Sequence, residues 1–503
     1  MIQEHKMRRW LGLLALMPAV AMIFIDQSVL PVALPTIQKE LGGTHTELWW
    51  CINAYLLLSA VLLLLGGKIG EWIGYRRVFS WGILIFALSS LLCGLSQTID
   101  LLIGARALQG VGAALLIPAS SSLTMSLFPQ NERGKALGLN ISISSIFLVL
   151  APLIGGYFTQ ELSWRWIFWI NLPLAAAGLI LVLLFIPASP KGTVKSNPLG
   201  FFFFIVSSSA LIMLIMQGPA WGWGSFASLS LFVLCLVSAF FLFREEKRAR
   251  YPLFDLSLFR HPIYQAITIS VSATQFVLMI TIYRAIFFQQ VLDLTPLNNG
   301  LILFFTSLPL LFMAFVGGWL ADRSGPKIPL ALGFTLLIYS FFWLAFFIQM
   351  GLGMVVMGLL AFSIGVPLIF TPSYSSAMGV IPPKKSGSAF GILATARSFS
   401  ASLGVAVIGA FSRHVQLHSF QDLLEKNPET HSLNASALET QSTLAPEQTQ
   451  LVSSYLKESQ VSGFFWVHLA IGLALIIAFA LVFIFYHRKA SHHLPETSAE
   501  GWD

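Results

Sequence analysis

Four charged residues lie deep inside long apolar stretches, and they are the first candidates for chemistry. They are Asp26, Arg106, Arg284 and Arg397. A charged side chain near the centre of a bilayer costs roughly 2.5–3.5 kcal/mol on insertion scales, so such residues usually face a cavity or a partner. The pattern therefore predicts a charged site within a membrane, with proton or ion movement as its chemistry.

Asp26 is the acid that lies well inside a predicted helix, and its short side chain cannot reach water from there. Low-dielectric surroundings favour the neutral form of a carboxyl group, so such a group can bind and release a proton. A proton-coupled carrier needs a group of this kind, because its protonated and ionised forms must favour different conformations. The alternative is a structural acid that pairs with an arginine.

The three arginines have different predicted roles. Arg106 lies about six residues from the outer end of its predicted helix, so pairing and extension to the membrane surface are both open. Arg397 is predicted to be structural. Arg284 would favour an anionic or carboxylate-bearing substrate if it faces a cavity, whereas its long side chain could also reach the interface or pack.

Other polar residues of the apolar runs are weaker candidates. Tyr55 and Gln275 are predicted to line a substrate cavity, where sparse polar groups among aromatic side chains suit an amphipathic molecule. His468 lies alone in a predicted helix and is predicted to be a packed residue rather than a proton relay.

Two glycine-rich, basic loops repeat one pattern. The first is GKIGEWIGYRR, from Gly67 to Arg77, and the second is GWLADRSGPK, from Gly318 to Lys327. A repeated loop between apolar runs indicates a duplicated bundle, which is the usual architecture of transporters. Acids beside bases at helix ends can form contacts when the cytoplasmic side closes, so the loops are predicted latches; simple turn geometry is the alternative. The predicted latch residues are Gly67, Glu71, Gly74, Arg76, Gly318, Asp322, Arg323 and Gly325.

The composition places these residues in an integral membrane protein. Apolar residues make up 56% of the chain and charged residues 10%, against about 25% charged in soluble proteins. The formal charge of +7 does not indicate nucleic-acid binding, because the basic residues lie in short loops between apolar runs. The three cysteines fall inside apolar segments without metal-site spacing, so neither a metal nor a cofactor is expected.

Fourteen apolar runs are long enough to cross the ~30 Å hydrocarbon layer. The first is predicted to be a retained helix rather than a signal peptide. The predicted spans are 10–34, 48–67, 78–96, 100–123, 136–158, 166–186, 198–216, 226–243, 264–291, 298–319, 328–349, 352–376, 389–411 and 463–486.

The charge distribution predicts the orientation. With fourteen spans and a cytoplasmic N-terminus, most of the 29 Lys and Arg residues lie on the cytoplasmic side. We therefore expect a multi-pass protein of the cell (inner) membrane with both termini in the cytoplasm.

The spacing of the two loops predicts the domain organisation. The first loop lies between spans two and three and the second between spans ten and eleven, so two helices are inserted between two six-helix bundles. We predict an N-terminal bundle over 1–186, a linker with the two inserted helices over 187–245, and a C-terminal bundle over 246–503. A polar extracellular loop is predicted at about 412–462, disordered or with a short amphipathic helix.

Several motifs resemble those of a known family. Helix four carries RALQGVGAA, from Arg106 to Ala114, and the first helix ends in IDQSVLPVALP, from Ile25 to Pro35. With the two loops and the stretches at 164–173 and 387–406, the chain resembles the major facilitator superfamily, and within it the fourteen-helix drug:proton antiporters. The resemblance implies two six-helix bundles that move by alternating access, and it implies proton-coupling roles for Asp26 and Arg106.

The resemblance also implies helix-packing roles for Gln109, Gly110, Pro152, Gly155 and Gly156. The chain departs from the family pattern at Pro31, Phe147 and Ala151, where Asn and glycines are expected. Because small residues let helices approach and slide, these departures leave antiport less well supported than transport.

The favoured prediction is proton-coupled efflux of amphipathic small molecules. Export of a specific metabolite or siderophore stays open, as does a non-transporting sensor or scaffold with the same fold. A nucleotide-binding loop and the common motifs of hydrolases are absent from the sequence, so an ATP-driven pump or an intramembrane enzyme is disfavoured. The expected partners are a small-molecule substrate, protons and the lipid bilayer, while a periplasmic adaptor or outer-membrane channel is not determined.

Overall fold

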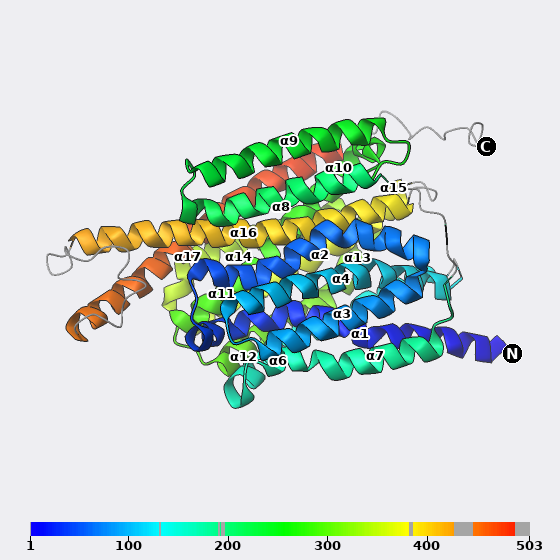
Figure 1. Cartoon of the computed structure of the whole chain (residues 1–503). Helices are drawn as coiled ribbons and strands as arrows, with labels where there is room; N and C mark the ends of the chain where they lie inside the picture. Colours follow the sequence, from blue (N-terminus) through cyan, green and yellow to red (C-terminus); the bar gives the residue numbers. More distant parts are fainter. Residues whose placement is uncertain are drawn as a thin grey trace.

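The computed structural model describes residues 2–129, 132–189, 192, 197–381, 386–426 and 446–487. Every regular element in these ranges is a helix, and most of the helices run side by side along one direction (Figure 1). Within the described residues, fourteen helical spans are long and apolar enough to cross a membrane. The predicted all-helical membrane fold with fourteen spans is therefore confirmed.

The bounds of the elements follow the apolar runs, because only helices satisfy the backbone hydrogen bonds of a chain in lipid. The first six spans comprise α1 Ile2–Leu41, α2 His45–Ile73, α3 Tyr75–Leu95, α4 Ile99–Leu127, α5 Arg133–Tyr157 with the π-helix η1 Phe158–Leu162, and α6 Trp166–Trp169 with α7 Asn171–Phe185. The inserted pair comprises α8 Pro198–Trp221 and α9 Phe226–Arg248. The last six spans comprise α10 Pro262–Leu278 with α11 Ile280–Gln290, α12 Pro296–Ser307 with α13 Pro309–Ser324, α14 Lys327–Phe347, α15 Leu352–Val380, α16 Ser386–Lys426 and α17 Pro446–His487. Two short 3₁₀ helices are η2 Leu256–Arg260 and η3 Ile348–Met350.

Local sequence signals explain where several spans begin and end. Thr44 and Glu47 form a capping box at the start of α2, in which each residue hydrogen-bonds to the backbone N–H of the other. The two repeated loops turn at equivalent glycines. Gly74 has φ 97° and Gly325 has φ 75°, in the region that favours glycine.

The inserted helices lie at the edge of the structure. α8 packs on α9 and also contacts α2 and α16, whereas α9 is the outermost helix along the top of Figure 1. Large apolar side chains of α9 are exposed, Phe226, Phe232 and Phe240 among them. In a membrane this apolar face contacts lipid.

The described parts of the predicted polar stretch at 412–462 are helical, which agrees with the amphipathic alternative and not with a disordered loop. α16 continues to Lys426, and α17 already begins at Pro446. Both extensions project beyond the other helices (Figure 1). Phe420, Leu424 and Val452 form a small buried cluster between them, so amphipathic packing stabilises helices where the polar composition indicated a loop.

The two bundles contact each other at the end opposite to the first residues of α1. The side-chain amide of Gln289 donates to the Val32 carbonyl at 2.8 Å, and the Leu297 N–H donates to the Gln160 side chain at 3.2 Å. The backbones of α5 and α12 also approach closely. A Cβ atom added to Gly156 would lie 2.5 Å from the Pro296 oxygen.

We expect Gly156→Val to weaken this contact by about 1–3 kcal/mol, the usual cost of overpacking. The added side chain must push α5 and α12 apart, which favours a state that is open on this side. Spin labels at Gln160 and Leu297 should report longer distances in the variant. Gly104→Val is the matched control, because a Cβ at Gly104 has no neighbour within 4 Å. Unchanged distances with Gly156→Val would contradict the prediction.

Candidate functional site

A buried ion pair joins α1 to α4. Arg106 Nη1 donates to Asp26 Oδ2 at 2.5 Å, and both side chains are almost fully withdrawn from the surface. Arg106 Nε donates to the Cys51 carbonyl of α2 at 2.9 Å. The structure thus brings together the two residues that were predicted for proton coupling, and Arg106 does not extend to the membrane surface.

Gln109 completes the surroundings of the carboxylate. It lies one turn after Arg106 on α4, so both side chains occupy the same helix face. Its Nε2 donates to Asp26 Oδ1 at 2.9 Å and to Ser90 Oγ at 2.8 Å, while its Oε1 accepts from Arg106 Nη1 at 2.6 Å. Asn171 of α7 donates to the same Ser90 hydroxyl at 3.2 Å. The first, third, fourth and sixth spans therefore meet in one polar network.

Aromatic side chains enclose this network. The Arg106 guanidinium lies 4.5 Å from the Tyr55 ring centroid and 5.9 Å from that of Phe168. Tyr55 also packs edge-on against Phe86 at 6.4 Å. Tyr55 is thus placed beside the ion pair, and its predicted substrate contact stays a prediction.

The predicted helix-packing residues lie where backbones approach most closely. A Cβ at Gly110 would lie 2.4 Å from the Tyr55 carbonyl oxygen, and one at Gly155 would lie 2.8 Å from that of Val29. The Pro152 carbonyl approaches Gly300 of α12 in the same way, at 2.4 Å from the position of a Cβ. Small residues thus allow α4 to approach α2, and α5 to approach α1 and α12.

Arg284 forms a second buried charged site, on α11. Its side chain is fully buried, which does not fit the alternative of extension to the membrane surface, and its predicted role toward a substrate stays a prediction. Its Nε donates to His468 Nε2 on α17 at 3.1 Å. Gln275 lies on α10 with nine-tenths of its surface buried, and no described contact assigns it to substrate binding.

The two repeated loops differ in their contacts. In the first, Lys68 pairs with Glu71 at 2.9 Å, and the Arg76 guanidinium donates to the Leu183 carbonyl at 2.8 Å. In the second, the Arg323 guanidinium lies 4.5 Å from the Trp319 ring centroid. These contacts stay within one bundle, so the latch role of Glu71 and Asp322 stays a prediction.

Sequence reasoning missed a polar contact among three helices. Asn53 of α2 accepts a hydrogen bond from Ser402 Oγ of α16 at 2.6 Å, and its Nδ2 lies 2.7 Å from the Met216 sulfur of α8. Asn53 and Ser402 are fully buried. An asparagine inside an apolar run was the available signal, because a buried amide requires partners.

Glu246 was also missed, because it lies in a charged stretch that reads as a solvated helix end. Its carboxylate accepts from the backbone N–H groups of Leu253 at 3.1 Å and Phe254 at 2.9 Å. It also accepts from the Asn197 side chain at 3.3 Å. The buried carboxylate therefore fixes the end of α9 to the start of α8 and to the connection that leads into η2.

We expect Glu246→Gln to lower the free energy of unfolding by about 1–3 kcal/mol. The amide loses one acceptor oxygen, which leaves one of the two partly buried backbone donors without its partner. The neighbouring Glu245→Gln, which is partly exposed, makes the same change of charge and should cost less than half as much. Thermal unfolding in detergent measures both variants, and equal melting temperatures would refute the assignment.

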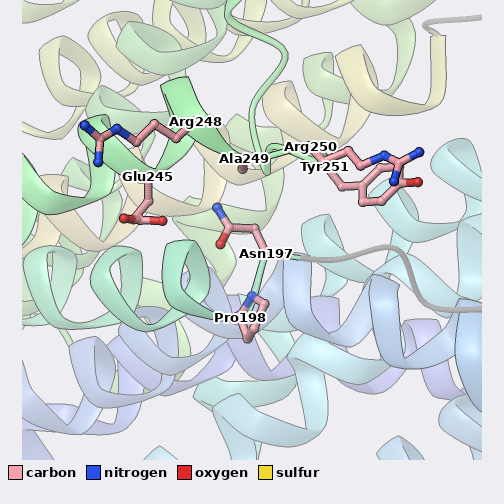
Figure 2. Close-up of a pocket in the computed structure, with 7 residues that line it drawn as sticks. All are labelled: Asn197, Pro198, Glu245, Arg248, Ala249, Arg250 and Tyr251. Atoms are coloured by element: carbon pink, nitrogen blue, oxygen red, sulfur yellow. The ribbon is translucent and has the colours of Figure 1, made fainter.

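A cavity of about 200 Å³ lies at the same end of the inserted pair. It is lined by Asn197, Pro198, Glu245, Arg248, Ala249, Arg250 and Tyr251. Figure 2 shows the guanidinium groups of Arg248 and Arg250 pointing to opposite sides, so they do not converge on one ligand. This cavity contains none of the predicted site residues.

Fourteen apolar spans in the described residues, with ionisable side chains in their interior, define a multi-pass membrane protein. The chain belongs to the Major Facilitator Superfamily, whose family model matches residues 16–405. The predicted superfamily is thereby confirmed.

Similar proteins are named as resistance, export or transport proteins. The chain is 32% identical to the multidrug resistance protein Stp of Mycobacterium tuberculosis, over 77% of this chain and 73% of that protein. It is 29% identical to the tetracenomycin C resistance and export protein of Streptomyces glaucescens, over 80% and 76%. It is also 29% identical to the riboflavin transporter RibZ of Clostridioides difficile, over 80% and 88%.

Solved structures share the fold. A bacterial homolog of the human lysosomal transporter Spinster, in an inward-facing and unoccupied conformation, matches with a TM-score of 0.65 and 16% identity, over 95% of this chain and 97% of that one. A D-xylose-proton symporter matches with a TM-score of 0.61 and 14% identity, over 93% and 97%. At these identities the likeness shows the architecture alone.

Proposed function

We propose that this transporter exports amphipathic small molecules from the cytoplasm in exchange for protons. The observation that carries the proposal is the buried Asp26–Arg106 pair with its Gln109 bridge. A carboxylate in this network has two stable states. It is ionised when it is paired with Arg106, and it can be protonated when the pair opens.

The pair supports coupling because the network spans several helices. Protonation of Asp26 removes the charge that balances Arg106, so the guanidinium must find another acceptor or move. The resulting shift in contacts among α1, α2 and α4 gives the two protonation states different preferred conformations. Each proton that enters down the membrane potential supplies about 2.3 kcal/mol per 100 mV.

The proposed movement is a rocking of the bundles 1–186 and 246–503, with both termini in the cytoplasm of a cell whose inner membrane holds the protein. The contacts between α5 and α12 join the two bundles on the side opposite to the N-terminus, which is the outer side if the N-terminus is cytoplasmic. The repeated loops at Gly67–Arg77 and Gly318–Lys327 would then close the cytoplasmic side in the alternate state.

Export is supported by relatives that are named as multidrug resistance and tetracenomycin C resistance and export proteins. Export of a specific metabolite is the second candidate, because another relative of similar identity is named as a riboflavin transporter. The substrate panel below separates the two.

The test uses the purified full-length protein in proteoliposomes with an imposed pH gradient. Amphipathic cations, anions and neutral molecules, with riboflavin, are offered in turn while internal pH and substrate uptake are measured. Uptake that requires the gradient and dissipates it supports proton-coupled export. Uptake at a rate that does not depend on the pH gradient would exclude proton coupling. Uptake of a single compound would favour the export of a specific metabolite.

A further inference from the structure

The buried charge of Arg284 has no ion-pair partner among the described residues. α10, α11, α12, α14 and α15 contain neither Asp nor Glu. The acids of the remaining described helices lie toward the helix ends: Asp322 on α13, Asp422 and Glu425 on α16, and Glu447 and Glu458 on α17. A fully buried guanidinium without a counter-ion costs several kcal/mol, which argues that a charge from outside the chain completes the site.

The arginine is held in a defined orientation. Its guanidinium lies 5.0 Å from the Phe341 ring centroid on α14 and 4.7 Å from that of Phe362 on α15. His468 accepts at Nε2 from Arg284 Nε, and its Nδ1 lies 2.8 Å from the Phe464 carbonyl. These two contacts require an imidazole with its proton on Nδ1, so His468 is neutral and supplies no charge.

Two donor atoms of Arg284 stay unused. Nη1 and Nη2 are buried and have no hydrogen-bond partner among the described residues. They form the end of the guanidinium that binds a carboxylate or sulfonate through two parallel hydrogen bonds. The Phe341 and Phe362 rings lie near the guanidinium, and His468 accepts the hydrogen bond from Nε. The Nη1 and Nη2 end is therefore available to a ligand.

The position of the site in the fold gives an independent argument. In the N-terminal bundle the polar network joins the first, third, fourth and sixth spans, through Asp26, Ser90, Arg106 and Asn171. In the C-terminal bundle Arg284, Phe341, Phe362 and His468 come from the first, third, fourth and sixth spans as well. The N-terminal network thus pairs an arginine with Asp26. At the corresponding place in the C-terminal bundle, the described residues offer Arg284 no acid to pair with.

We propose that Arg284, with His468, Phe341 and Phe362, binds the carboxylate or sulfonate group of an aromatic, amphipathic substrate. This inference rests on the proposed transport function and specifies the charge of the molecule carried. Because the side chain is buried, the anion enters when α11, α14, α15 and α17 move apart during the transport cycle. The aromatic residues contact the apolar part of the ligand, and the guanidinium binds its charged oxygens.

Binding to the purified full-length protein tests the proposal directly. The probes are naphthalene-2-sulfonate, the neutral naphthalene-2-sulfonamide and the cation 2-naphthylmethylammonium, measured by calorimetry. We expect the sulfonate to bind the wild type at least tenfold more tightly than either matched probe. Equal affinities for the three probes would overturn the proposal.

Two substitutions locate the anion. Arg284→Gln should remove the tenfold preference, and Arg284→Lys should retain part of it, because an ammonium keeps the charge but not the two-pronged geometry. Arg165→Gln, which changes the net charge equally at a partly exposed pair with Glu40, should leave the preference intact. A preserved preference in Arg284→Gln would refute the site. If Arg284→Gln does not fold, the sulfonate preference of the wild type and its partial loss in Arg284→Lys still test the site.

Further measurements separate the alternatives. Chloride that displaces naphthalene-2-sulfonate at millimolar concentration, with equal affinity for both, would indicate a site for inorganic anions and overturn the substrate assignment. Sulfonate binding that requires Arg284, without gradient-driven uptake of any compound, would support the site and reject the proposed export. Normal proton-coupled uptake of cations by Arg284→Gln, with unchanged sulfonate affinity, would reject the site and leave export standing.

Discussion

Replacing Arg106 with methionine should lower the free energy of unfolding by about 3–5 kcal/mol, the usual cost of breaking a buried ion pair. The substitution leaves the Asp26 carboxylate with Gln109 as its remaining described side-chain donor. It also removes the donor that reaches the Cys51 carbonyl. Thermal and denaturant unfolding in detergent at pH 8 measure the loss.

The loss should decrease as the pH is lowered, because protonation of Asp26 removes the unpaired charge in the variant. The double variant Asp26→Leu with Arg106→Met should recover most of the stability, since a buried pair can often be replaced by apolar residues without net cost. Arg165→Met is the control at the partly exposed pair with Glu40, where about 0–1 kcal/mol is expected. A loss as small as this at Arg106 would show that the buried pair is not needed for stability.

Replacing Asp26 with asparagine should abolish the coupling of transport to protons. Asparagine keeps one carbonyl oxygen for the bond from Arg106, but it has no group that gains and loses a proton in the physiological range. In inside-out vesicles, substrate-triggered collapse of the pH gradient should fall at least tenfold. Substrate exchange without net proton movement should continue.

Asp293→Asn provides the matched control, because Asp293 is an exposed acid that pairs with Lys457 at 2.6 Å. It should collapse the gradient as the wild type does. If Asp26→Asn also collapses the gradient at the wild-type rate, the proton binds elsewhere. If neither the wild type nor the control responds to any compound, the proposed proton coupling fails.

The position of a charged residue in an apolar run predicts that it is important, but it does not predict which other residue it contacts. Asp26 and Arg106 were both singled out by their position in apolar runs, yet their separation by 80 positions gave no indication that they touch. Pairing requires that α1 and α4 cross at one depth, which side-chain packing decides. The motif on α4 pointed to Gln109, because one helical turn places it beside Arg106.

Arg284 illustrates the opposite situation. Its distance from the helix end allowed extension to the membrane surface, because the long side chain can span more than one turn. The structure instead buries it between Phe341 and Phe362, residues that the sequence did not distinguish from other phenylalanines. His468 packs against Phe464 at a centroid distance of 3.7 Å, as predicted for a packed residue, and in addition accepts from Arg284.

The sequence by itself determined the class of the molecule: fourteen spans, the repeated loops and the superfamily all follow from patterns within single segments. Hydrophobic runs of sufficient length must be helical in lipid, because no other local structure satisfies the backbone there. The tertiary structure alone decided which charges are neutralised. Asp26 meets Arg106 and Gln109, whereas Arg284 meets aromatic rings and a neutral histidine, because contacts between distant segments depend on how the helices pack.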